Sequence, residues 1–140
     1  MITGASSGLG AALAGLYAAR GADLTLSGRN LDRLRDVAAD CRETLAAASG
    51  EVVFDAADVT DAEAMQAWLA AVDERRPIDM LYANAGVGGS RVVVGPQGED
   101  PAMAADIVAT NLTGVLNTVI PVLPAMMRRG GGHIVLLSSL

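Results

Sequence analysis

Short apolar runs alternate along the chain with longer segments of helical periodicity. Three of the runs are continuous stretches of β-branched residues and leucine, which is typical of strands covered on both faces. Read as strands, the runs are 1–3, 22–27, 51–55, 78–83 and 133–138, and the helical segments are 8–20, 30–48, 62–75 and 101–129. This alternation predicts repeated βαβ units, and therefore a doubly wound parallel α/β sheet with strand order 3-2-1-4-5, cut off after the fifth strand.

Apolar side chains recur at helical spacing on the predicted helices and indicate the faces that pack in the core. The first helix carries Leu9, Leu13, Leu16 and Tyr17 on one face, and the third carries Met65, Trp68, Leu69 and Val72. Cys41 shares the apolar face of Leu34, so we expect a packed thiol rather than a reactive one. Pro121 and Pro124 predict a kink in the fourth helix, because each removes a backbone donor.

The composition excludes several classes of function. The chain has 140 residues, enough for one domain spanning residues 1–140. Its formal net charge is −6 and its ten basic residues are all arginine. This balance argues against a nucleic-acid partner, and the lack of lysine excludes a Walker A loop and Schiff-base chemistry. The sequence has neither about eighteen uninterrupted apolar residues nor a leader-like start, so it predicts a cytoplasmic protein without a membrane partner.

Residues 3–10, Thr-Gly-Ala-Ser-Ser-Gly-Leu-Gly, lie between the first predicted strand and the first helix. Glycines here let the backbone turn tightly and bring its amides against a pyrophosphate, and the helix N-terminus adds free N–H groups. Glycines also occur in ordinary turns, so the strand before and the helix after are what favour dinucleotide binding. The expected cofactor-binding residues of this loop are Thr3, Gly4, Ser6, Ser7, Gly8, Leu9 and Gly10.

The end of the second predicted strand indicates which dinucleotide would bind. An NAD site typically has an acidic residue about twenty positions after the glycines, where it binds the ribose 2′-hydroxyl. Here Gly28 stands at that place and Arg29 follows it. A carboxylate would repel a 2′-phosphate, whereas an arginine can bind it through two parallel hydrogen bonds. The sequence therefore favours NADP over NAD, although Arg29 could also be an ordinary exposed loop residue.

Further motifs follow the later strands in order. Asp58-Val59 comes after the third strand, Asn84-Ala85-Gly86 after the fourth, Asn111 within the fourth helix and Ser138-Ser139 at the end of the fifth strand. Together with the pattern Thr-Gly-x-x-x-Gly-x-Gly at residues 3–10, this series resembles the short-chain dehydrogenase/reductase family, whose fold is a Rossmann-type sheet. The resemblance spans the whole chain.

The resemblance implies hydride transfer between a nicotinamide and a carbonyl or secondary alcohol, and so a small-molecule substrate of that class. In this family Ser139 would hold the substrate oxygen and Asn111 would support the proton relay. The remaining motif residues would bind the cofactor, and these are Asp58, Val59, Asn84, Ala85 and Gly86.

Each of these residues also has a purely structural interpretation. Asp58 could cap a turn, and Asn84 could hold backbone groups at a strand end. Asn111 lies four residues from both Ile107 and Val115, so we expect it on the buried face of its helix, where its amide needs a hydrogen-bond partner.

One element of the family does not occur in these 140 residues. The family's proton donor is a tyrosine whose pKa is lowered by a lysine four residues later, and Tyr17 and Tyr82 each have a glycine at that distance. In the family this motif lies about a dozen residues beyond the position of Ser139. We therefore expect part of a longer enzyme, incomplete at both ends. The alternative is a non-catalytic dinucleotide-binding module or a truncated, inactive family member.

The fifth predicted strand, residues 133–138, would form an edge of the sheet. An apolar edge strand presents unpaired backbone groups and invites pairing with another chain. The sequence therefore predicts a homo-oligomer.

Overall fold

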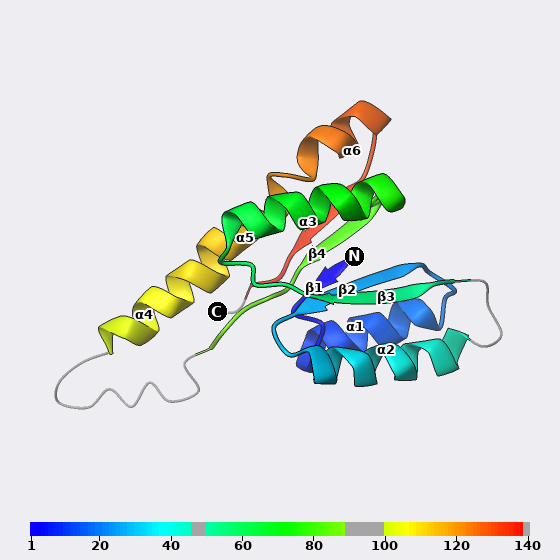
Figure 1. Cartoon of the computed structure of the whole chain (residues 1–140), viewed down its shortest axis with the longest axis horizontal. Coiled ribbons are helices and arrows are strands. Elements are labelled where there is room, and N and C mark those ends of the chain that lie inside the picture. Colours follow the sequence, from blue (N-terminus) through cyan, green and yellow to red (C-terminus); the bar gives the residue numbers. More distant parts are fainter. Residues whose placement is uncertain (46–49, 89–99, 139–140) are drawn as a thin grey trace.

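A five-stranded parallel sheet forms the centre of the protein in the computed structural model, which describes residues 1–45, 50–88 and 100–138 (Figure 1). The strands are β1 (Ile2–Thr3), β2 (Leu24–Gly28), β3 (Val52–Ala56), β4 (Met80–Ala83) and β5 (His133–Leu136). They lie in the order β3-β2-β1-β4-β5, and every pairing is parallel. The Rossmann-type fold and the strand order expected from the sequence are therefore confirmed.

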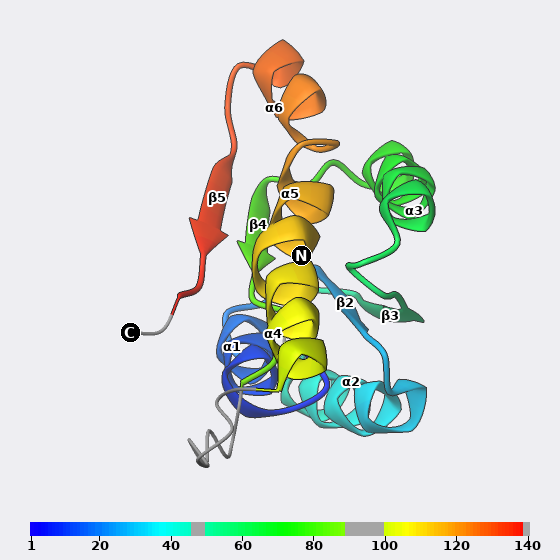
Figure 2. The same ribbon diagram turned by 90° about the vertical axis from the view of Figure 1, so that its left-hand side faces the viewer.

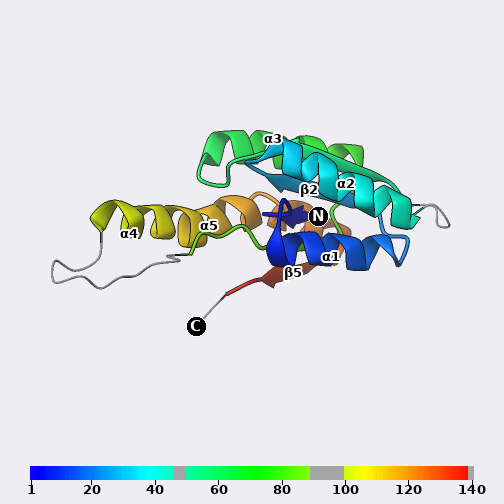
Figure 3. The same ribbon diagram turned by 90° about the horizontal axis from the view of Figure 1, so that it is seen from below.

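Helices cover both faces of this sheet. The helical elements are α1 (Gly8–Ala18), α2 (Leu31–Leu45), α3 (Ala62–Arg75), α4 (Pro101–Val108), the π-helical turn η1 (Ala109–Thr113), α5 (Gly114–Val119) and α6 (Leu123–Arg129). In Figure 1, α1 and α2 lie below the sheet and α3 and α6 above it, and Figures 2 and 3 show the same two layers from the side and from below. The sheet is therefore doubly wound, with one apolar cluster on each face.

The face that α1 buries differs in part from the predicted one: Leu13 and Tyr17 pack against an apolar cluster as expected, but Leu9 and Leu16 do not. Its buried residues are Gly10, Ala14 and Ala18, whereas Leu9 and Leu16 are 56% and 48% exposed. Small side chains let the helix lie close to the sheet, and a Cβ at Gly10 would be 2.4 Å from a backbone oxygen. Placing Leu9 and Leu16 in the core was therefore wrong, because this close approach selects small residues over large apolar ones.

The predictions for α2 and α3 are confirmed. Cys41 is 1% exposed and packs with Leu34, and burial raises the pKa of its thiol. Met65 and Leu69 are buried in the second cluster. Trp68 packs against that cluster and donates its indole N–H to a carboxylate of β3. Both helices are thus held to the sheet by the apolar positions that the sequence indicated.

The predicted fourth helix, residues 101–129, is interrupted twice. A turn around Pro121 separates α5 from α6, which confirms the predicted kink. The sequence did not indicate the second interruption, η1. A π-helical turn adds one residue and rotates the face that follows it. The buried positions in this region are consequently Thr110, Gly114 and Thr118.

Within the described residues, the segment Pro101–Arg129 is long and apolar enough to cross a membrane, and 22% of its most apolar window is buried. Length and composition are weak grounds for a membrane span, because core helices of other domains pass the same test. Here α5 packs against α3 and β4, and Val122 and Met126 belong to an apolar cluster of the domain. The expectation that the protein does not enter a membrane stays a prediction.

Candidate functional site

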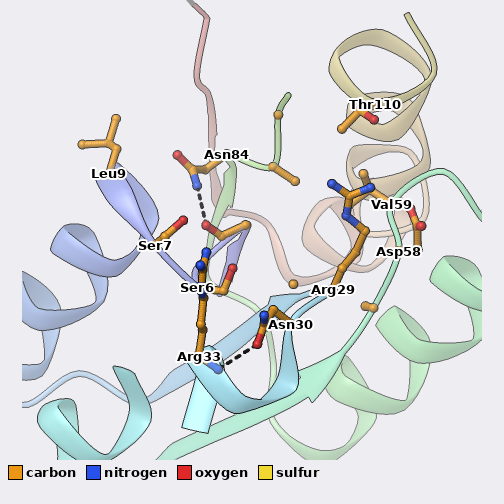
Figure 4. Close-up of a pocket in the computed structure, with 15 residues that line it drawn as sticks. Ser6, Ser7, Leu9, Arg29, Asn30, Arg33, Asp58, Val59, Asn84 and Thr110 are labelled. Atoms are coloured by element: carbon orange, nitrogen blue, oxygen red, sulfur yellow. Dashed lines mark hydrogen bonds between the residues drawn. The ribbon is translucent and has the colours of Figure 1, made fainter. Parts of the chain in front are cut away.

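A cleft of about 410 Å³ opens at the carboxyl ends of the strands (Figure 4). Its walls come from the segments that directly follow β1, β2, β3 and β4, together with the first turns of α1 and α2. The strand order changes direction at β1, because β2 pairs with one edge of β1 and β4 pairs with the other. Ligands of open α/β sheets bind at such a switch point, outside the carboxyl ends of the strands.

The loop between β1 and α1 fits an anionic group. Ser7 is the N-cap residue of α1, and its side chain makes no capping hydrogen bond to the helix. The first amides of α1 are therefore open toward the cleft, at the positive end of the helix dipole. Gly8, at φ +56°, has no atom within 4 Å of the place where a Cβ would lie. The uncapped first turn of α1 therefore offers backbone N–H donors that suit a diphosphate.

Two other glycines of this loop allow close packing instead. A Cβ on Gly4 would lie 2.7 Å from Ala85 Cα, and Gly4 has a φ of +65°, which favours glycine. A Cβ on Gly10 would lie 2.6 Å from the Asn84 side chain. These glycines thus let the first loop, α1 and the end of β4 meet.

Polar groups of Thr3 and Asn84 lock the ends of β1 and β4 together. Thr3 Oγ1 accepts from the backbone N–H groups of Asn84 and Ala85, at 3.1 Å each, and donates to Tyr82 O at 3.3 Å. Asn84 Nδ2 in turn donates to Thr3 O at 2.9 Å and to Gly4 O at 3.2 Å. The network holds the floor of the cleft in one conformation. The Asn84 side chain thus holds backbone groups at the end of a strand, as its structural interpretation predicted.

At the end of β2, Gly28 and Arg29 line the cleft. A Cβ on Gly28 would lie 3.4 Å from Ser6 Oγ, so glycine keeps this part of the floor clear. Arg29 forms no ion pair among the described residues. Arg33, from the first turn of α2, also lines the cleft and was missed by the sequence analysis. Its four-residue spacing from Arg29 was the signal that could have identified it.

Asp58 caps the turn that follows β3. Its Oδ1 accepts from Thr60 N at 2.9 Å and from Thr60 Oγ1 at 2.8 Å. These hydrogen bonds, helped by the charge of Arg29, lower the pKa of the Asp58 carboxyl although partial burial acts in the opposite direction. Asp58 is thus a carboxylate at neutral pH, and both bonds from Thr60 go to one of its two oxygens. Val59, also in the cleft wall, is buried against α5.

Asn111 lies in η1 and clamps the segment after β4. Its Oδ1 accepts from Val87 N at 2.8 Å, and its Nδ2 donates to Val87 O at 2.9 Å. The predicted need for a hydrogen-bond partner is met, but the expected burial is wrong, since Asn111 is exposed. The cause is the π-helical turn, which places Thr110 and Gly114 on the buried face instead.

The structure thus brings most of the predicted residues together. Those that line the cleft are Gly4, Ser6, Ser7, Leu9, Arg29, Asp58, Val59, Asn84, Ala85 and Gly86. Thr3, Gly8 and Gly10 are not among the lining residues, and they lie next to them in β1 and α1. Ser139 lies outside the described residues, and the adjacent Ser138 follows the end of β5. Among the described residues, no group of three or more His, Cys, Asp or Glu side chains could hold a metal ion.

The family model of the short chain dehydrogenases matches residues 1–140. The chain belongs to this family. Among the curated members, the glycine betaine reductase ATRR of Emericella nidulans is 37% identical over 140 residues, which are 99% of this chain and 10% of that protein. Bacterial oxidoreductases of the family are matched over 54% or 53% of their length. The chain therefore spans about half the length of these bacterial relatives and a tenth of the length of the fungal reductase.

Solved structures of family members share the fold. A metagenomic short-chain oxidoreductase in complex with NADP is 34% identical, with a TM-score of 0.85 over 99% of this chain and 61% of that one. An NAD+-bound xylitol dehydrogenase is 28% identical, with a TM-score of 0.85 over 95% of this chain and 49% of that one. Because the two bind different dinucleotides, the family likeness supports a nicotinamide dinucleotide cofactor without distinguishing NADP from NAD.

Proposed function

We propose that this chain is the nucleotide-binding part of an NADP-preferring oxidoreductase, which transfers hydride between the nicotinamide and a carbonyl or secondary alcohol. Family membership supports the reaction class. The observation that carries the cofactor preference is the end of β2, where Arg29 lines the cleft without an ion-pair partner in the described part of the chain. An arginine in this position favours a 2′-phosphate, which a carboxylate would repel.

The cofactor, when bound, would supply the hydride as NADPH or accept it as NADP+. The open first turn of α1, with Ser6, Ser7, Gly8, Leu9 and Gly10, would bind the diphosphate through backbone N–H groups. In the described part of the chain Asp58 Oδ2 accepts no hydrogen bond, which suits an amino group of adenine, and Val59 would form an apolar wall beside it. Asn84, Ala85 and Gly86, fixed by Thr3, would border the ribose on the nicotinamide side.

The chemistry would take place beside the ends of β4 and β5. In this proposal Ser139 holds the substrate oxygen, and Asn111 fixes the backbone at Val87 while its own helix supports the proton relay. The 140 residues contain no lysine and no Tyr-x-x-x-Lys motif. We therefore propose that the 140-residue chain alone binds the dinucleotide without reducing a carbonyl, and that the longer enzyme supplies the tyrosine and lysine.

Calorimetric titration of the 140-residue chain with NADPH and NADH tests the proposal. NADPH should bind about tenfold or more tightly than NADH, which corresponds to about 1.4 kcal/mol or more. The variant Arg29→Ala should lose most of this difference. Arg20→Ala is the matched control, because Arg20 is exposed at the end of α1, away from the cleft, where it donates to Leu16 O. Equal affinities, or a preference that survives Arg29→Ala, would contradict the role of Arg29.

We also propose that the protein forms a homo-oligomer. At the edge of the sheet β5 exposes Leu136, and the segment α4 to α6 exposes Val108, Leu112 and Ile120 at intervals of four or eight residues. Exposed apolar surface of this kind favours association with a second copy. Sedimentation velocity should show a dimer or larger species at micromolar concentrations, and a clean monomer would contradict the proposal.

A further inference from the structure

Two residues of α5 that are unfavourable in a helix contact the same residue of the turn after β3. Glycine and asparagine both have a lower helix propensity than alanine, leucine or methionine. Gly114 and Asn117 nonetheless lie three positions apart in α5, so they share one face of the helix. A Cβ on Gly114 would lie 2.5 Å from the Val59 side chain, and Asn117 Nδ2 donates to Val59 O at 2.9 Å. Contact with Val59 therefore accounts for both residues.

The hydrogen bond from Asn117 joins this turn, residues 57–61, to a separate element of the fold. Ala57 N donates to the last carbonyl of β2 at 3.1 Å, which fixes the start of the turn to the sheet. The hydrogen bonds of the Asp58 side chain stay within the turn. Among the described residues, Asn117 makes the one hydrogen bond that connects the turn to α5. The orientation of the peptide at Val59 therefore depends on this amide.

The turn and the helical segment form one side of the cleft. Asp58 and Val59 line the cleft, and so does Thr110, which lies in η1 directly before α5 (Figure 4). Asn117 is not among the lining residues, and it is half-buried where it contacts Val59. Its amide therefore acts on a ligand in the cleft through the turn and not by direct contact.

We propose that Asn117 is a positioning residue for the adenine part of the cofactor, because it holds the turn of Asp58 and Val59 against α5. This inference rests on the proposed function, in which Asp58 Oδ2 binds the amino group of adenine. A hydrogen bond weakens steeply as its geometry departs from the ideal, so a carboxylate selects a donor best when its oxygen is held in place. The preorganisation that Asn117 supplies thus sets how well the cleft distinguishes adenine from a base without this amino group.

The test compares two dinucleotides that differ only in the base. NADPH contains adenine, and its hypoxanthine analogue has a carbonyl oxygen in place of the amino group. In calorimetric titrations the wild-type chain should bind NADPH about tenfold more tightly than the analogue, because the carboxylate of Asp58 repels the carbonyl oxygen. Asn117→Ala should weaken the binding of NADPH about fivefold and that of the analogue by less than about twofold. Most of the selectivity for adenine would then be lost.

Two further variants separate positioning from a merely structural role. Asn117→Asp keeps the shape of the side chain but, as a carboxylate, cannot donate to Val59 O, so it should lose the selectivity at least as completely as Asn117→Ala. In Asp58→Ala the turn has no carboxylate to position. Adding Asn117→Ala to that variant should therefore change the affinity for NADPH by less than about twofold, whereas a general structural defect would lower it in both backgrounds.

Gln66→Ala is the matched control. It also removes a carboxamide from a helix, but Gln66 is exposed on α3 and lies outside the cleft. The affinities of this variant for both dinucleotides should equal those of the wild type. Asn117→Ala should remain folded, since alanine has the higher helix propensity.

The outcomes separate the inference from the function on which it rests. If the wild-type chain binds neither dinucleotide, the proposed function is wrong. If it binds both equally, dinucleotide binding stands, but Asp58 does not select the base and the inference fails. The inference is also overturned if Asn117→Ala keeps the preference for NADPH, if it weakens both ligands by the same factor, or if its effect persists in Asp58→Ala.

Discussion

The two ends of the sheet hold cavities of opposite character. At the carboxyl end, the cleft of about 410 Å³ is lined by glycines, hydroxyls and two arginines without ion-pair partners in the described residues. At the amino end, a larger cavity of about 760 Å³ is lined by charged groups, several of which pair within the chain. There Arg76 pairs with Asp23 and lies 3.6 Å from Glu51, and Arg129 pairs with Asp73.

The candidate cleft is the smaller of the two, but it includes the first turn of α1, which has no side-chain cap, and the cavity at the amino end includes no such helix start. At the amino end even the two tyrosine hydroxyls are hydrogen-bonded to each other, and this bond to Tyr17 raises the pKa of Tyr82. Among the described residues at the carboxyl end, the first turn of α1 has no side-chain cap, and Arg29 and Arg33 line the cleft without an ion pair. A ligand gains hydrogen bonds only where the protein has left donors unpaired.

The largest expected effect is at the carboxyl end, where Gly10→Ala breaks the close packing of α1. The new Cβ would lie 2.4 Å from Gly4 O and 2.6 Å from Asn84 Nδ2, so backbone must move. We expect a loss of about 3 kcal/mol in the free energy of unfolding. Urea denaturation measures this loss, and nucleotide titration should show that binding is lost.

Gly15→Ala is the control for this change, since it puts the same methyl group on the same helix. No atom lies within 4 Å of the new Cβ, so the variant should be more stable than the wild type by about 0.5 to 1 kcal/mol. Equal stabilities of the two variants would mean that α1 does not pack on the loop as described.

The next effect is a pH dependence that arises at the amino end. In the isolated 140-residue chain, the Met1 amine donates to Met80 O at 2.8 Å, and burial lowers its pKa from 8.0 to about 6, more than the carboxylate of Asp79 raises it. Between pH 6 and 8 the unfolded chain binds more protons than the folded one, so stability rises with pH in this range. The total rise over the whole titration corresponds to about 3 kcal/mol, since each pKa unit is worth about 1.36 kcal/mol.

Urea denaturation at several pH values measures this rise, and N-terminal acetylation isolates it. The acetylated chain has no titrating amine, so the part of the pH dependence that differs between the two chains belongs to Met1. Identical profiles from pH 6 to 8 would show that the amine is not buried in the folded protein.

A smaller effect is expected from Thr3→Val, which tests the network between β1 and β4. Valine has nearly the same shape but leaves the N–H groups of Asn84 and Ala85 without their acceptor. The loss should be about 2 kcal/mol in the free energy of unfolding. Thr44→Val is the control, because Thr44 is exposed on α2 and donates only to Asp40 O, and it should change stability by less than about 0.5 kcal/mol. A similar loss in both variants would argue against the network.

The smallest effect is expected from Arg129→Ala at the amino end. Arg129 donates to Asp73 Oδ2 at 2.7 Å and to Ile78 O at 3.0 Å, and Asp73 also accepts from Ile78 N. Although burial acts to raise the pKa of Asp73, these hydrogen bonds lower it overall. The variant should melt at a slightly lower temperature than the wild type while binding nucleotide as before. Arg128→Ala, at the neighbouring position, is the control and should have no effect. Weaker nucleotide binding by Arg129→Ala would contradict the claim that the two ends of the sheet act independently.

The sequence predicted the fold because its apolar runs and glycines are local signals of strands and turns. It did not predict η1 or the buried face of α1, since both depend on contacts between distant segments. Val59, for example, packs so close to α5 that a Cβ on Gly114 would lie 2.5 Å from the Val59 side chain. No residue spacing within the helix indicates this contact.

The candidate site was predicted to a similar extent. Its glycines, Asp58 and Asn84 belong to motifs, so they could be identified by position in the sequence. The partner of Asn111, the backbone of Val87, could not, because a side chain in a helix can meet many loops. Arg33 could have been identified by its four-residue spacing from Arg29, but the spacing alone does not show which arginines pair with carboxylates within the chain.

The central claim is that the carboxyl end of the sheet binds the nucleotide and the larger cavity at the amino end does not. Titration of the 15N-labelled 140-residue chain with NADPH, followed by amide chemical shifts, tests it most directly. The account predicts dispersed spectra in which saturable shifts concentrate at Ser6, Gly8 and Gly28, while Gly21 and Asp23 at the amino end stay in place. Shifts centred on Gly21 and Asp23, or no saturable shift in a folded chain, would contradict the account.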